Sequence, residues 1–163
     1  MKKIIAAAAT SLILLAGCSE PVEIVFEGTL EVSNAYVSAT DEGSSMGGMM
    51  MAGAFMDIFN NTDESVTLIS AESEVAGLVE IHEVVGGVMR EKDGGIVIAP
   101  DETSVLKPGG NHVMLMELDR ELVVGNELLL TLEFSDGTRV DVMAAVKDVS
   151  ADQEEYDDSH SGM

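Results

Sequence analysis

The chain has 163 residues, which is enough for one domain with a hydrophobic core. Its 30 acidic residues outnumber its 8 basic residues, and the formal net charge of −22 excludes nucleic acid and anionic membrane surfaces as natural partners. The charge favours cations, metal ions or basic protein surfaces, although a need for solubility alone would also account for it. With Cys18 as the one cysteine, the chain has no second thiol for a disulfide, a zinc–thiolate site or thiol redox chemistry.

The N-terminal segment has the features of an export signal. Two lysines precede an apolar run over residues 4–15, which is too short to span a bilayer as a mature helix. The run ends in Leu15-Ala16-Gly17-Cys18, which resembles a bacterial lipobox. We therefore expect residues 1–17 to be a signal peptide and Cys18 to carry the acyl chains of an extracytoplasmic, membrane-anchored lipoprotein. The alternative is an ordinary secretory signal followed by a chance cysteine.

Composition divides the mature chain into three parts. Residues 18–28 form a short acidic tether, and residues 29–149 form the folded domain. Residues 150–163 hold five acidic residues and no lysine or arginine, which predicts a disordered acidic tail. The tail also contains His160 and Met163, so it could collect a metal ion.

Within the domain, apolar residues recur with a period of two, which is typical of strands rather than helices. Turn signals such as Asn60-Asn61, Gly86-Gly87 and Asp136-Gly137 separate the alternating runs. The pattern predicts an all-β sandwich or barrel. The predicted strands cover residues 30–37, 66–70, 78–85, 95–98, 112–118, 128–134 and 139–146.

The segment Met46–Met51 contains four of the 11 methionines of the chain. Glycines at 47 and 48 disfavour a packed-core role for its first residues, so we expect a loop between two strands.

A histidine and a methionine within one predicted strand are also chemically informative. His112 and Met114 are two residues apart, so both side chains leave the same face, and Met116 continues that face. Imidazole and thioether groups together favour Cu(I), because a thioether is a poor ligand for Mg, Ca or Zn. On these residues alone, a buried histidine beside an apolar methionine is the simpler interpretation.

An enzymatic role has less support. Glu80 and Glu83 flank His82 and could orient a catalytic histidine, but no nucleophile, triad or glycine-rich phosphate loop accompanies them. We therefore predict that the protein is not an enzyme.

Longer stretches of the domain resemble the periplasmic copper chaperone family called PCuAC. The resemblance covers about residues 29–146, and its most specific part is Lys-Pro-Gly-Gly-x-His-x-Met with an upstream Glu-x-His-Glu. The matching runs are Gly53–Asn61, Leu78–Glu83, Gly87–Arg90, Leu106–Met116 and Leu128–Phe134.

The resemblance implies a Greek-key β-sandwich, cupredoxin-like or immunoglobulin-like, with one Cu(I) held by two histidines and two methionines. His82, His112 and Met114 match the ligands of the family. The fourth ligand differs, because the family hairpin ends Gly-Val-Met-Arg/Lys-Met, whereas this chain has Glu91 in place of the last methionine. Met89 is our first choice, a methionine of Met49–Met51 is a second, and a three-ligand site near Glu91 is a third.

These observations predict a lipid-anchored copper(I) chaperone of the cell envelope. The resemblance implies that it delivers copper by ligand exchange towards the CuA subunit of cytochrome oxidase, or to a Sco-type protein. The alternative function is a surface lipoprotein that sequesters copper for copper tolerance, with the Met46–Met51 segment and the tail as extra sites. A purely structural sandwich with a vestigial site is a third possibility.

Overall fold

The computed structural model describes residues 30–40, 45–46 and 49–149, and this part of the chain contains strands and no helix. The predicted signal peptide, the lipid attachment at Cys18, the tether and the acidic tail lie outside the described residues, so the predictions about them stay predictions. Among the described residues, no helical segment has the length and apolar character needed to cross a membrane.

The strands of this part of the chain are, in order, β1 (Leu30–Ser38), β2 (Ser45–Met46), β3 (Met49–Met50), β4 (Ala52–Asn60), β5 (Val66–Glu72), β6 (Ala76–Val85), β7 (Val88–Glu91), β8 (Ile96–Ile98), β9 (Thr103–Leu106), β10 (His112–Leu118), β11 (Glu127–Phe134) and β12 (Arg139–Lys147).

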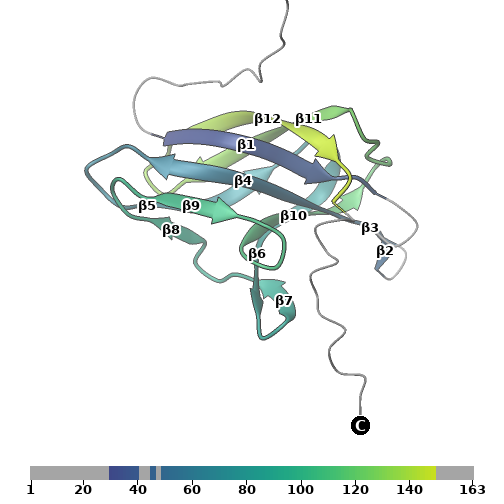
Figure 1. Ribbon diagram of the computed structural model, residues 1–163, viewed down its shortest axis with the longest axis horizontal. Coiled ribbons are helices and arrows are strands. Elements are labelled where there is room, and N and C mark those ends of the chain that lie inside the picture. The colour runs from purple at the N-terminus through teal and green to yellow at the C-terminus, as the bar shows by residue number, and fades with distance from the viewer. Residues whose placement is uncertain (1–29, 41–44, 47–48, 150–163) are drawn as a thin grey trace, which may run out of the picture.

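Ten strands form one continuous sheet that folds over on itself as a sandwich (Figure 1). The strand order is β7-β6-β10-β4-β1-β12-β11-β5-β8, and β9 pairs with β4 beside this path. β5 and β6 are far apart in this order but pack against each other, so the two halves of the sheet become facing layers. The prediction of an all-β sandwich is confirmed.

β1 connects the two layers. It pairs antiparallel with β4 along most of its length and parallel with β12 at its end. Its register against β4 shifts between Ser33 and Tyr36, where Asn34 has a positive φ of 54° and donates a hydrogen bond of 2.7 Å to Asp57. A bulge of this kind bends a strand, which allows β1 to belong to both layers.

The core lies between the layers and follows the alternation of the strands. Val113 and Leu115 of β10 are fully buried there, so His112 and Met114 leave from the opposite face of the same strand. β6 behaves in the same way, because Ile81 faces the core and His82 does not belong to the core cluster. Two central strands therefore present one apolar face and one face with imidazole and thioether side chains.

The prediction for residues 46–51 needs a correction. β2 and β3 pair as a two-stranded antiparallel sheet, with Met46 opposite Met49, where a loop was expected. Met50 packs against the core, whereas Met49 is half exposed. The composition of the segment favours a loop, but anchoring of one methionine in the core holds the segment extended. β9 was also not predicted, because two of its four residues are Thr and Ser and no apolar run marks it.

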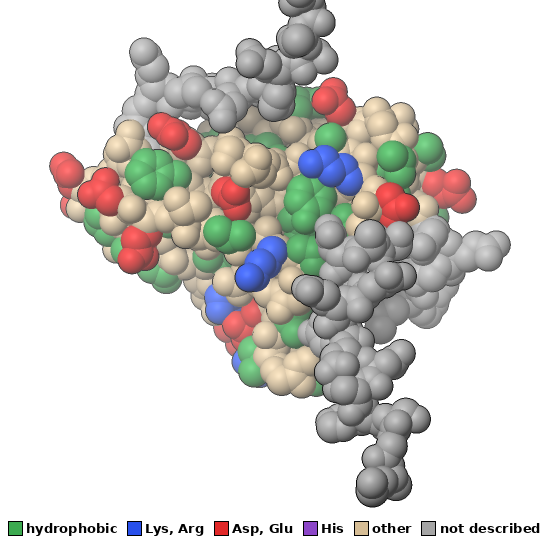
Figure 2. Space-filling model, viewed as in Figure 1, with side chains coloured by type: hydrophobic (Ala, Val, Ile, Leu, Met, Phe, Trp, Pro, Cys, Tyr) green, Lys and Arg blue, Asp and Glu red, His purple; other side chains and the backbone are tan. Residues whose placement is uncertain are grey.

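Two features of the surface stand out in the figures. The β6–β7 hairpin projects from the body of the sandwich (Figure 1). Figure 2 shows acidic side chains at the left and right edges of one face and within it, with basic side chains near its middle and at its lower edge.

Gly94 and Gly95 offer a matched test of the turn before β8. Both have a positive φ, 80° and 76°, but a Cβ on Gly95 would collide with the backbone oxygen of Leu68, whereas one on Gly94 meets nothing within 4 Å. We expect Gly94→Ala to cost about 1 to 2 kcal/mol for the left-handed backbone alone. Gly95→Ala should cost about 1 to 3 kcal/mol more because of the collision. Urea unfolding of both variants measures the difference, and equal stabilities would contradict this account.

Candidate metal centre

The pairing of β6 with β10 brings the predicted ligands together. His82 is directly opposite His112, and Glu80 is directly opposite Met114. Side chains that are opposite each other in a sheet leave the same face, so all four lie on the face that does not contribute to the core. The two imidazole rings are 5.7 Å apart between centroids and nearly perpendicular.

Met89 reaches this group from the outermost strand. β6 lies between β7 and β10, and Met89 is opposite Val84 of β6. Neighbouring strands are about 4.8 Å apart, so β7 and β10 are separated by two such spacings. The Met89 Sδ atom is nevertheless 3.2 Å from His112 Nε2. The two side chains therefore lean towards each other over the part of β6 that carries His82, which is 9% exposed.

The hydrogen bonds of His112 determine which of its nitrogens is free. Nδ1 lies 2.9 Å from the carbonyl oxygen of Gly110, which can only accept, so Nδ1 carries the proton. In the neutral ring, Nε2 then presents a lone pair to the Met89 sulfur, which is also an acceptor. Two electron-pair donors converge with no proton between them. A metal bound to both in a tetrahedral set would hold them roughly 3.5 Å apart, close to the separation seen here.

Burial keeps this imidazole neutral. His112 is 4% exposed, and its removal from water lowers its pKa. The hydrogen bond to Gly110 opposes this effect, and the neighbouring His82 adds to the lowering. A neutral imidazole is the form that binds metals, so the environment of His112 favours ligation.

His82 has one engaged nitrogen and one free nitrogen as well. Its Nε2 lies 2.8 Å from the Glu80 carboxylate. Its Nδ1 is buried and is the one buried side-chain nitrogen or oxygen of the described residues that has no hydrogen-bond partner. Buried polar atoms are nearly always paired, so a nitrogen without a partner, in a ring 5.7 Å from that of His112, fits a ligand for a metal ion.

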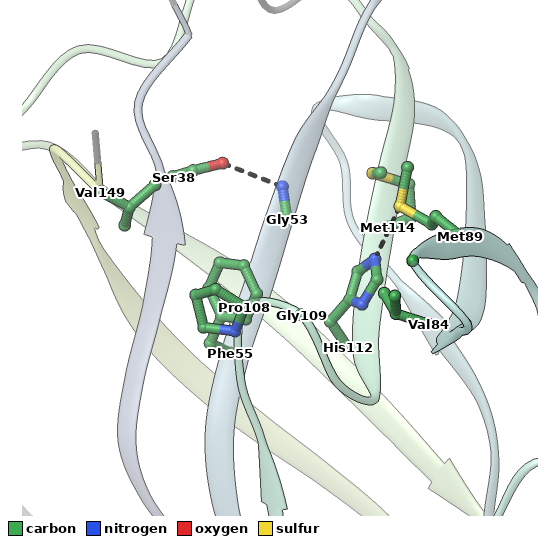
Figure 3. Close-up of a pocket in the computed structure, with 11 residues that line it drawn as sticks. Ser38, Gly53, Phe55, Val84, Met89, Pro108, Gly109, His112, Met114 and Val149 are labelled. Carbon is green, nitrogen blue, oxygen red and sulfur yellow. Dashed lines mark hydrogen bonds between the residues drawn. The ribbon is translucent and has the colours of Figure 1, made fainter. Parts of the chain in front are cut away.

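An open cavity of about 500 Å³ lies over His112, Met114 and Met89. Figure 3 shows these three side chains converging on one side of the cavity. Met114 is 7% exposed and yet does not belong to the core cluster, so its burial comes from the cavity side. Val84 and Gly87 of the hairpin complete this wall. The full lining is Ser38, Gly53, Phe55, Val84, Gly87, Met89, Pro108, Gly109, His112, Met114 and Val149.

Aromatic side chains form the opposite wall. The Phe55 ring lies 6.1 Å from the His112 ring and 5.1 Å from that of Tyr36, over which Lys147 Nζ sits at 4.9 Å. Gly53 makes room for this arrangement, because a Cβ there would lie 2.6 Å from Phe55 Cζ. The wall shields one side of the histidine from water.

The structure thus brings together His82, Met89, His112 and Met114, the four residues predicted as ligands. Of the alternatives for the fourth ligand, Glu91 is exposed and opposite His82. In the segment Met49–Met51, Met49 is half exposed, Met50 packs against the core and Met51 is partly buried. Met89 is the methionine in contact with a histidine nitrogen. Among the described residues, no three His, Cys, Asp or Glu side chains gather as a metal site, so a centre here depends on thioethers.

Sequence reasoning missed several residues of the centre. The roles of Phe55 and Gly53 depend on how β4 lies beside β10, which no local pattern reveals. The Gly110 carbonyl had a weaker signal, because it belongs to the Pro-Gly-Gly turn before His112 and such turns expose backbone oxygens.

Comparison with known proteins gives a family. Residues 30–146 match the family described as "Putative lipoprotein LpqE-like". The chain belongs to this family. The family is related to the PCuAC copper chaperones, as the resemblance in sequence suggested. A protein of Leifsonia xyli subsp. xyli, also described as a putative lipoprotein, is 35% identical over 131 residues, which are 78% of this chain and 75% of that protein.

Solved structures with the same fold include PCuAC domains. The metal-free PCuAC domain of PmoF1 is 27% identical, with a TM-score of 0.63 over 74% of this chain and 95% of that domain. The copper-bound PCuAC domain of PmoF2 is 25% identical, with a TM-score of 0.61 over 74% and 94%. The Cu(I) form of DR1885 from Deinococcus radiodurans is 26% identical, with a TM-score of 0.56 over 72% and 78%.

Proposed function

We propose that this protein binds one Cu(I) ion through His82, Met89, His112 and Met114 and passes it to another protein. The observation that carries the proposal is the 3.2 Å approach of the Met89 sulfur to the unprotonated Nε2 of His112. Two neutral electron-pair donors at this distance are compatible when a cation lies between them. Imidazole and thioether ligands, with no carboxylate in the set, favour Cu(I) over harder metals.

The likeness to copper-bound PCuAC domains supports the same metal. Copper is cargo in this proposal, and the protein performs no catalysis. Neutral ligands and an exposed Met89 suit ligand exchange, in which an acceptor with a better site takes the ion one bond at a time. We propose a copper-accepting protein such as the CuA subunit of cytochrome oxidase, or a Sco-type protein, as the partner.

The ligand set can be tested by titration with Cu(I) in the presence of a competing chelator. We expect one tight site, and His112→Ala or Met89→Leu should lower its affinity. The loss should exceed the roughly 10- to 100-fold typical of outer-shell partners, because a bond to the metal is removed. Met143→Leu is the matched control, since Met143 is half exposed on β12 in the other layer. Unchanged affinity in the Met89 and His112 variants would overturn the proposed site.

Delivery and storage make different predictions. A carrier should load one copper ion and lose it to a purified metal-free CuA domain, whereas a sequestering protein should load several ions and retain them. After mixing, the two proteins can be separated and the copper content of each measured. Retention of the metal, or a stoichiometry well above one, would favour the alternative function in copper tolerance, with Met46–Met51 and the tail as extra sites.

We further propose that the protein is held at the outer side of a membrane through acyl chains on Cys18. The lipobox-like sequence and the description of its relatives as lipoproteins support this location. Two acyl chains are sufficient for stable anchoring. Cys18→Ala should abolish the incorporation of labelled palmitate and move the protein from the membrane fraction to the soluble fraction. Continued palmitate labelling of the variant would show that the anchor is elsewhere.

A further inference from the structure

We propose that Glu80 is a positioning residue that makes His82 bind copper through Nδ1. The proposal rests on the proposed function, but its first step concerns the metal-free protein. Glu80 and His82 are two residues apart on β6, so their side chains share one face, and the carboxylate lies 2.8 Å from His82 Nε2.

This contact determines which nitrogen of the His82 ring carries the proton. An ionised carboxylate can only accept hydrogen bonds, so the contact at 2.8 Å places the ring proton on Nε2. Nδ1 must then carry the lone pair. Nδ1 is buried and has no hydrogen-bond partner, so a proton there would be left without an acceptor. The surroundings of both nitrogens therefore indicate a ring that carries its proton on Nε2.

Among the described residues, Glu80 forms an ion pair with His82 and with no lysine or arginine. Glu80 is opposite Met114 across β10, and His82 lies between His112 on one side and Glu91 on the other. The Glu80 side chain is 26% exposed and that of His82 is 11% exposed, so the hydrogen bond is partly shielded from water. Arg90 and Lys92, the nearest cations on the hairpin, are engaged by Glu83 on the other face of β6.

His82 and His112 then offer opposite ends of their rings. The Gly110 carbonyl accepts a hydrogen bond from Nδ1 of His112, which leaves Nε2 available. The Glu80 carboxylate accepts one from Nε2 of His82, which leaves Nδ1 available. Nδ1 lies closer to its own backbone than Nε2 does. Ligation through Nδ1 would hold the ion close to β6, beneath the His112 and Met89 side chains that lean over it. A carboxylate that accepts a hydrogen bond from the other ring nitrogen also orients the imidazole and strengthens its bond to a metal.

The test is nitrogen NMR of the histidine rings in the ¹⁵N-labelled protein, before and after loading with diamagnetic Cu(I). In the metal-free protein, we expect Nε2 of His82 to be protonated and Nδ1 to be bare. On loading, the resonance of His82 Nδ1 should shift, together with that of His112 Nε2. Shift of His82 Nε2 instead would overturn the assignment and leave the copper site intact. Absence of any copper-induced shift at either histidine would overturn the proposed function as well.

Three variants separate positioning from structural support. Glu80→Ala removes the hydrogen-bond acceptor of Nε2, so the proton of His82 should be shared between Nδ1 and Nε2. Cu(I) affinity should fall about 10- to 100-fold. Glu80→Gln retains an oxygen acceptor, so it should restore the single protonation state and most of the affinity. Glu72→Gln removes the same charge from an exposed ion pair with Arg139 on another strand and should change neither quantity. An unaltered His82 spectrum and affinity in Glu80→Ala would refute the role of Glu80.

Discussion

The pairing of β6 with β10 is the constraint on which the rest of the centre depends. It sets His82 opposite His112 and Met114 opposite Glu80. The register is held by the core, because Ile81, Val113 and Leu115 alternate with these residues and are buried between the layers. A slip of one residue would turn the histidine and methionine side chains into the core and the core side chains outwards. The apolar packing of the sandwich therefore determines the composition of its outer face.

Hydrogen bonds then determine the chemistry of that face. The Gly110 carbonyl and the Glu80 carboxylate each accept a hydrogen bond from one nitrogen of a histidine ring. Burial lowers the pKa of His112, which favours its neutral form. Each ring thus has a lone pair available before any metal arrives. The methionine sulfurs add no charge. A monovalent cation bound only by neutral ligands keeps its positive charge, which the net charge of −22 of the chain compensates at longer range.

The sequence predicted the fold and the side chains that share one face better than the arrangement of the strands around them. Alternation in residues 78–85 and 112–118 is a local property, so it revealed which side chains share a face. Which strands pair is not local, and the contact between Met89 and His112 depends on how an exposed hairpin curves over β6. The β2–β3 pairing was missed for a similar reason, since burial of Met50 overrides a composition typical of loops. The sequence suggested Glu80 as a partner of His82, but only the structure shows that it contacts Nε2 rather than Nδ1.

β7 is an edge strand of four exposed residues that pairs with β6 on one side. Opening such a strand disrupts few buried contacts and costs far less free energy than opening the centre of the sheet. Met89 stands on this strand, whereas His82, His112 and Met114 stand on strands paired on both sides. Three of the proposed ligands thus stand on strands within the sheet, and the fourth, Met89, stands on an edge strand that can open separately. The lifetime of a bound ion would follow the opening rate of one short hairpin, so metal exchange can be fast in a protein whose global unfolding is slow.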